Sequence, residues 1–331
     1  LAENRADQAW GYVLTGLVQN APRLRRLVLR DCTTSYDPLL RGVFAALAAR
    51  QKDGLVAVDL ARSSELVRAL PRDGFAPLAE RLCGLSLAGL RLREPHFLDV
   101  LPTLATLTHV EHLDLTDACE RVRSAPAVTQ GLLALARHAR TLALGDCYGR
   151  AVLVPFLEQL PEDTTLTRLD VPNNGLGDAG MAALVRALAR TPRLTHVNAD
   201  GNHTRLNGFL ALASLFLVNT TLAEIRFTDD LQRELAALTA PADRTRLMDA
   251  VARIHASLAG AAQRPLWYSS AQPRLVRPTP ATPSPLPEPP LLFQKQLEDL
   301  KNGVQPAYAA PAAGAPGLAA AAPAPAAEAP G

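Results

Sequence analysis

The stretch that decides the fold is LTRLDVPNNGL, residues 166–176. Leu166, Leu169, Val171, Asn174 and Leu176 occupy the fixed positions of the pattern LxxLxLxxNxL. The alternation of apolar residues at 169 and 171 predicts a short β-strand with one buried face. The asparagine three residues later predicts a turn, because its amide can pair with backbone groups that the chain leaves unpaired there.

Weaker copies of this pattern recur at an almost constant spacing. Helical patterns such as Met181, Leu184 and Leu188 lie between them. A strand followed by a full helix predicts an α/β fold, a right-handed leucine-rich repeat solenoid (horseshoe) of the ribonuclease-inhibitor-like class. The eight copies are separated by 31, 27, 28, 29, 27, 28 and 28 residues and begin at Leu24, Leu55, Leu82, Val110, Ala139, Leu166, Leu194 and Leu222.

A single repeat is too small to fold alone. Ordering about 28 residues costs roughly 1 to 2 kcal/mol per residue in backbone entropy. About six buried aliphatic side chains return only ~1.5 to 3 kcal/mol each. Neighbouring repeats must therefore share one core. The asparagine position falls on Asn174 and Asn202, and also on Cys32 and Cys147, where we expect a structural thiol.

Strand alternation separates core residues from those on the opposite, concave surface of the sheet. In the first repeat Leu27 and Leu29 point into the core, whereas Arg26, Val28 and Arg30 point outward. We call the surface formed by these three outward positions in all eight repeats the inner face. We expect its central row to be exposed, namely Asp59, Ser86, Asp114, Ala143, Asp170, Asn198 and Arg226, flanked by His112, Thr116, Arg168, His196, Asp200, Glu224 and Thr228.

Concave solenoid surfaces commonly bind extended protein partners. Each of these residues taken alone is better interpreted as a solvated polar position, so the hypothesis concerns the cluster. The candidate partner-binding residues are His112, Asp114, Arg168, Asp170, His196, Asn198, Asp200 and Arg226.

The sequence favours a binding protein over an enzyme. No serine or cysteine nucleophile has an obvious base beside it, and there is no Gly-rich phosphate loop. His112 and His196 belong to repeats three strands apart, and a strand spacing of about 4.8 Å separates them too far for shared metal ligation. The four cysteines contain no CxxC pair. We predict no catalytic residues, no metal and no cofactor.

The overall composition restricts the classes of partner. The chain has 34 Lys and Arg against 32 Asp and Glu, which does not favour nucleic acid. No apolar stretch approaches the roughly 18 to 20 residues that span a membrane. We interpret the cysteines as reduced thiols of a cytoplasmic protein. Protein partners are therefore expected, and a homodimer is left open.

The pattern also predicts how the chain is divided. The solenoid covers 1–230, a helical cap 231–264, a proline-rich linker 265–290, a short amphipathic helix 291–302 and a disordered Ala/Pro tail 303–331. Within the linker, Arg277, Pro280 and Pro283 match RxxPxxP, the pattern of a ligand for an SH3-type domain.

The end of the repeat region resembles the leucine-rich repeat domain of CARMIL proteins. The likeness is carried by GNHTRLNGFLALASLFLVNTTLAEIRFTDDL (201–231) and PADRTRLMDAVARIHASL (241–258). It covers about the first 260 residues and is specific only from about Leu166 to Leu258. The resemblance implies a cytoplasmic scaffold of the actin cortex that links regulators such as capping protein and myosin I. The residues that carry it are Asn202, Thr204, Gly208, Phe209, Asn219, Thr221, Leu222, Phe227, Asp230, Arg244 and Thr245.

The family's capping-protein motif is not matched. Arg277 and Pro278 are followed by Thr279 instead of lysine, and the upstream leucine and histidine are missing. Two other functions remain open. One is a ribonuclease-inhibitor-like recognition module, and the other is a Ran-type GTPase activator, although the acidic tail of such activators is replaced here by alanine and proline.

Overall fold

The computed structural model describes residues 5–6, 8–21, 23–34, 39–49, 55–68, 74–217 and 219–262. The chain divides into two units, and every described residue belongs to the first, Leu1–Ala281. The predicted linker, short amphipathic helix and tail lie outside the described residues, as do Arg277, Pro280 and Pro283.

Eight parallel strands form the main sheet, and each pairs with the strand of the next repeat. The partners of the central leucine positions run Leu27, Val58, Leu85, Leu113, Leu142, Leu169, Val197 and Ile225. This register reproduces the spacing read from the sequence. The strands are β2 (Arg26–Val28), β4 (Val56–Asp59), β5 (Leu82–Ser86), β6 (His112–Asp114), β7 (Thr141–Ala143), β8 (Arg168–Asp170), β9 (His196–Asn198) and β10 (Glu224–Arg226). A small separate sheet joins β1 (Arg5–Ala6) to β3 (Thr33–Thr34).

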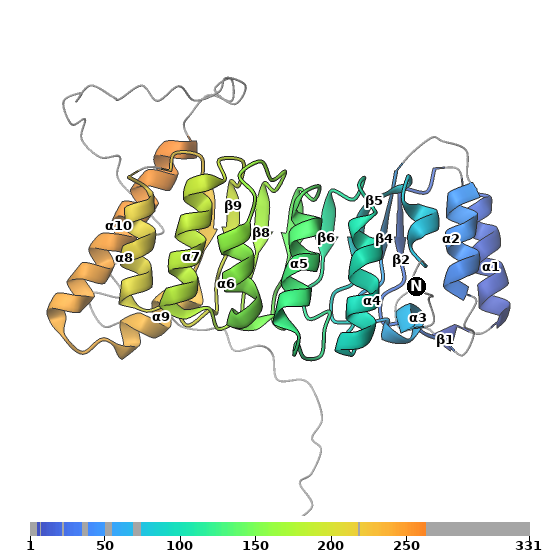
Figure 1. Cartoon of the computed structure of the whole chain (residues 1–331), viewed down its shortest axis with the longest axis horizontal. Helices are drawn as coiled ribbons and strands as arrows, with labels where there is room; N and C mark the ends of the chain where they lie inside the picture. Colours follow the sequence, from blue (N-terminus) through green and yellow to red (C-terminus); the bar gives the residue numbers. More distant parts are fainter. Residues whose placement is uncertain are drawn as a thin grey trace, which may run out of the picture. The chain divides into compact units, whose positions relative to one another are not determined.

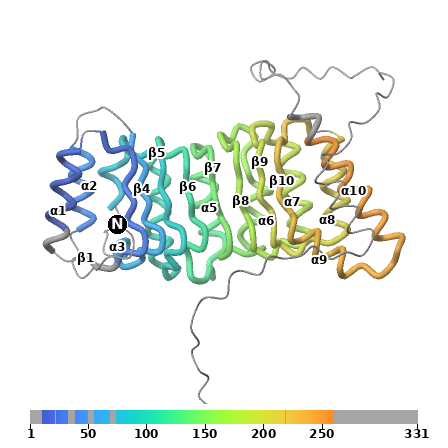
Figure 2. Tube along the Cα trace, turned by 180° about the vertical axis from the view of Figure 1, so that it is seen from behind, coloured from blue at the N-terminus to red at the C-terminus, as the bar shows by residue number. Residues whose placement is uncertain are grey.

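The repeat helices lie on one face of this sheet, in front of it in Figure 1 and behind it in Figure 2. The repeat between β4 and β5 is irregular, with a five-residue helix and a 3-10 turn, η1 (Ala76–Leu78). The α/β leucine-rich repeat solenoid predicted from the pattern is therefore confirmed. The helices are α1 (Gln8–Gln19), α2 (Leu39–Ala49), α3 (Ser64–Arg68), α4 (Glu94–Ala105), α5 (Ala125–Ala136), α6 (Gly149–Gln159), α7 (Gly177–Arg190) and α8 (Leu206–Leu215), followed by α9 (Thr228–Ala237) and α10 (Pro241–Ala262).

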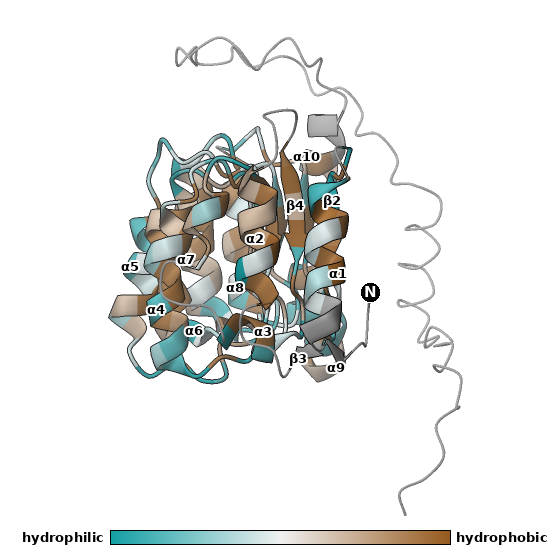
Figure 3. Cartoon of the chain, turned by 90° about the vertical axis from the view of Figure 1, so that its right-hand side faces the viewer, coloured by the Kyte–Doolittle hydropathy of each residue, from teal (hydrophilic) through white to brown (hydrophobic). Residues whose placement is uncertain are grey.

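The core is a continuous apolar layer between the strands and the helices. The central leucines of the strands are at most 8% exposed, and large aromatic side chains fill the space under the sheet. Figure 3 shows hydrophobic residues on strand β4 and on the helices, whereas the loops are mostly hydrophilic. Among the largest buried side chains are Phe44, Phe75, Phe97, Phe156 and Phe209.

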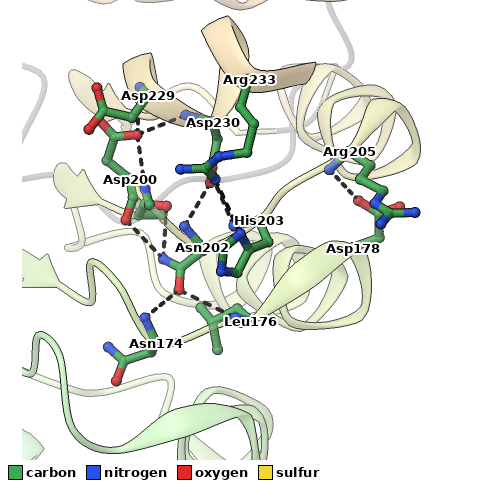
Figure 4. A network of polar contacts seen from close by, with 12 residues as sticks. Asn174, Leu176, Asp178, Asp200, Asn202, His203, Arg205, Asp229, Asp230 and Arg233 are labelled. Carbon is green, nitrogen blue, oxygen red and sulfur yellow. Dashed lines mark hydrogen bonds and ion pairs between the residues drawn. The ribbon is translucent and has the colours of Figure 1, made fainter. Parts of the chain in front are cut away.

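Buried amides at the asparagine position hold each turn to the previous one (Figure 4). Nδ2 of Asn202 donates to Val171 O at 2.9 Å and to Ala199 O at 2.8 Å, and Oδ1 accepts the backbone N–H of Asn174 at 2.9 Å. Asn174 repeats this one turn earlier and donates to Leu144 O at 2.7 Å. The structural role predicted for both asparagines is confirmed.

Asp230 ends this series, which we call the asparagine ladder (Asn174, Asn202 and Asp230). Its fully buried carboxylate accepts the backbone N–H of Asn202 and of His203, each at 2.9 Å. The guanidinium of Arg233 lies 2.8 Å away and compensates the buried charge. The repeat pattern places Asp230 at the end of the solenoid, and in the structure α9 already begins at Thr228, so Asp230 lies in its first turn.

A tyrosine performs the ladder's function where the pattern has a cysteine. The buried hydroxyl of Tyr148 donates to Leu115 O at 2.8 Å. Leu115 has the same position in its repeat as Leu144, whose carbonyl accepts a hydrogen bond from Asn174. The neighbouring Cys147 is half-buried, and this burial raises the pKa of its thiol to about 12.

Removing one side chain of the asparagine ladder should destabilise the whole solenoid. Asn202→Ala leaves three carbonyls and two N–H groups without that partner, so we expect a loss of about 2 to 4 kcal/mol in the free energy of unfolding. Chemical denaturation measures it. The control is Asn207→Ala on the exposed side of α8. A loss below about 1 kcal/mol for Asn202→Ala would contradict the role of the ladder.

The raised pKa of Cys147 predicts a thiol that reacts slowly. Since the thiolate is the nucleophile, a pKa near 12 leaves Cys147 almost entirely protonated at pH 8. We expect its alkylation by N-ethylmaleimide to be on the order of 100-fold slower in the folded chain than in guanidinium. Mass spectrometry of the labelled peptides measures both rates, and equal rates would refute the burial argument.

Candidate functional site

The strand register arranges the predicted binding residues in two rows of the inner face. Asp114, Asp170, Asn198 and Arg226 share the central row with Val28, Asp59, Ser86 and Ala143. The next row contains Arg26, Ala57, Gly84, His112, Thr141, Arg168, His196 and Glu224. Seven of the eight candidates thus lie in adjacent rows. The eighth, Asp200, follows β9.

Charges at the C-terminal end of the inner face are paired along their own strands. Arg168 Nε lies 3.0 Å from the carboxylate of Asp170, and Arg226 Nε lies 2.6 Å from Glu224. The hydrogen bond from Arg226 lowers the pKa of the Glu224 carboxyl. One oxygen of Asp170 is buried without a hydrogen-bond partner. Ion pairs at a protein surface stabilise a fold by only about 0 to 1 kcal/mol, so these pairs contribute little to stability.

The expectation that Asp59 is exposed is wrong. Asp59 occupies the central row, but its residue is only 4% exposed. Arg30 Nε lies 2.7 Å from its carboxylate and Arg26 lies at 3.6 Å. Two long arginines from β2 and the turn after it cover the shorter acid, a consequence that strand alternation alone does not predict.

The carboxylate of Asp200 accepts hydrogen bonds from backbone groups of the fold. Its Oδ1 accepts the backbone N–H of Asp229 at 2.8 Å and of Asp230 at 3.2 Å, so it caps the first turn of α9 (Figure 4). It also accepts the N–H of Gly201 at 3.0 Å. The sequence places Asp200 on the inner face but does not reveal that the next repeat starts with a helix above it.

The two histidines are placed as the sequence predicts. The strand order β6-β7-β8-β9 separates His112 from His196 by three strands. His112 Nδ1 lies 3.0 Å from Thr141 Oγ1, and His196 Nδ1 lies 2.8 Å from Thr195 Oγ1. Within the described residues, no group of three or more His, Cys, Asp or Glu is arranged to hold a metal ion.

The middle of the inner face is built from small side chains. β5 contributes Gly84 and Ser86, and β7 contributes Thr141 and Ala143. Between them, Asp114 Oδ1 accepts the N–H of Thr116 at 3.1 Å, and Oδ2 accepts the hydroxyl of Ser86 at 3.3 Å. Apart from the exposed His112 on β6, few groups protrude here, so a polypeptide can approach this part of the inner face closely.

No protein-family description matches the chain. Known proteins are similar to parts of this chain. Leiomodin-1 of Homo sapiens is 33% identical over 82 residues, which cover 25% of this chain and 14% of leiomodin-1. Tonsoku-like protein of Bos taurus is 32% identical over 124 residues, which cover 38% of this chain and 8% of that protein. The chain therefore spans only a small part of the relatives that it matches.

A solved structure of similar arrangement is the leucine-rich repeat-containing protein LegL7 of Legionella pneumophila. The two align with a TM-score of 0.43 and 15% sequence identity, over 71% of this chain and 82% of LegL7. Among the described residues, no helix is long and apolar enough to cross a membrane.

Loss of the Asp200 carboxylate should loosen α9 specifically. Asp200→Ala removes the cap, and we expect a loss of about 1 kcal/mol in unfolding free energy. Asp200→Asn keeps an acceptor oxygen and should retain most of the stability. Hydrogen exchange of the amides of Asp229 and Asp230 reports the local effect. Exchange unchanged by Asp200→Ala would show that the carboxylate does not cap the helix.

Proposed function

We propose that this chain is a non-enzymatic scaffold that binds a protein partner on its inner face. The observation that carries the proposal is the contrast between the two faces of the sheet. Helices pack on one face, whereas the inner face is a regular grid of strand side chains. Such a grid suits an extended polypeptide or the broad surface of a folded protein.

We further propose that the partner belongs to the actin cortex. This step rests on the resemblance to CARMIL proteins, which is carried by the last repeats and by α9 and α10. The same region holds Asp230. It also holds Phe209 and Phe227, whose ring centroids lie 5.4 Å apart, so that the two rings join α8 to the turn before α9. Myosin I and regulators of actin filaments are the partners to test first, in the cytoplasm at the cell cortex.

The other partners remain secondary proposals. An SH3-type domain would bind at Arg277, Pro280 and Pro283, and a homodimer would use a second copy of the chain. A ribonuclease-inhibitor-like module would use the same inner face for a different target. A Ran-type GTPase activator would differ from all of these, because it would accelerate GTP hydrolysis.

Two double charge-reversal variants test whether the inner face or the helix side of the sheet binds the partner. Arg168→Glu with Arg226→Glu places acids on the inner face, and Arg186→Glu with Arg193→Glu makes the same change on the helix side and in the turn after α7. The inner-face variant breaks two ion pairs, Arg168–Asp170 and Arg226–Glu224, and the control breaks one, Arg186–Glu158, so thermal unfolding of both variants is measured to show that each remains folded. We expect the inner-face variant to weaken binding at least tenfold and the control to bind normally.

Binding is measured with purified actin filaments, capping protein and myosin I, each tested separately by co-sedimentation or biosensor. Binding to one of them that is lost only in the inner-face variant supports the cortical scaffold. Equal loss in both variants contradicts the inner face as the binding surface. Acceleration of GTP hydrolysis by a small GTPase would instead favour the activator.

A further inference from the structure

Asp114 is an inner-face carboxylate that forms no ion pair with the described residues and, unlike Asp200, caps no helix. Asp59 is paired with Arg26 and Arg30, Asp170 with Arg168, and Glu224 with Arg226. By contrast, no Lys, Arg or His nitrogen of the described residues lies within 4.0 Å of the Asp114 carboxylate. Its two hydrogen-bond donors, the N–H of Thr116 and the hydroxyl of Ser86, are both neutral.

The turn after β6 does not require a negative charge at position 114. At the equivalent position of β9, Asn198 Oδ1 accepts the N–H of Asp200 at 3.2 Å, as Asp114 Oδ1 accepts that of Thr116 at 3.1 Å. In β4, Asp59 Oδ1 accepts the N–H of Ala61 in the same way. An amide therefore does the same structural work as the carboxylate, so the fold does not account for the negative charge at 114.

The surroundings of Asp114 leave space for a partner group. Its neighbours in the central row are Ser86 and Ala143, and the adjacent row holds Gly84, the exposed His112 and Thr141. The carboxylate is half-buried and is held by two hydrogen bonds, so it is already oriented. A carboxylate offers about four lone-pair sites, so two acceptor sites remain for an incoming donor.

We propose that Asp114 is the anchor that selects a basic side chain, an arginine or lysine of the protein partner, at the centre of the inner face. The inference rests on the proposed function of this face. A cation there would compensate a charge that is partly removed from water, which a neutral donor cannot do. The small residues of β5 and β7 let the partner backbone approach near enough for its side chain to reach the carboxylate.

The test selects random twelve-residue peptides displayed on phage against the full chain. Three forms are compared: native, Asp114→Asn and the control Asp163→Asn, an exposed turn acid whose side chain forms no hydrogen bond or ion pair with the described residues. The native chain and the control should enrich peptides with Arg or Lys at one recurrent position. The Asp114→Asn chain should lose that enrichment, and synthetic peptides should bind it about tenfold more weakly. Thermal unfolding checks that each variant is folded, and the Asn198 precedent predicts an unchanged midpoint.

The possible results separate the two proposals. Peptides without a basic preference, or basic peptides that bind Asp114→Asn as well as the native chain, overturn the inference about Asp114. If binding of those peptides still falls in the Arg168→Glu, Arg226→Glu variant, the inner face remains the binding surface. Peptide binding that no inner-face variant affects overturns both.

Discussion

The inter-repeat hydrogen bonds of the asparagine ladder fix how the C-terminal repeats of the solenoid stack on one another. Each strand of the main sheet has only three to five residues, and the chain must then turn away with its backbone groups in the protein interior. A buried unpaired backbone group costs about 1 to 3 kcal/mol, which short strands cannot offset. In the C-terminal repeats the side chains of Asn174, Asn202 and Asp230 remove that cost and tie each turn to the previous one.

The ladder also explains why the C-terminal repeats are the most regular. Towards the N-terminus the same position holds Ala118, Leu90, Ser63 and Cys32. Ser63 still accepts the N–H of Cys32 at 2.9 Å and donates to Leu29 O at 2.6 Å. The side chains of Leu90 and Ala118 can neither accept nor donate a hydrogen bond. A parallel bridge between Leu92 and Cys119 forms beside them, where the backbone of neighbouring repeats pairs directly.

The sequence predicts the fold well because one period fixes the strand register. The spacing that begins at Leu24 assigns the partner of every central leucine, and with it the two rows of the inner face. Side-chain length and the start of the next helix are not encoded in that period. The cover that Arg26 and Arg30 place over Asp59, and the use of Asp200 as a helix cap, therefore could not be predicted. Tyr148 gave one usable signal, since a tyrosine beside a failed asparagine position can supply the missing donor.

We propose that partners bind the inner face of the sheet and not the helices. A photo-crosslinking amino acid placed at Ala143, in the middle of the inner face, tests this directly when compared with the same group at the exposed Ala189 on α7. In lysate of the source organism, irradiation should give a discrete higher-mass protein adduct from Ala143 and none from Ala189. Adducts from Ala189 alone would contradict the claim.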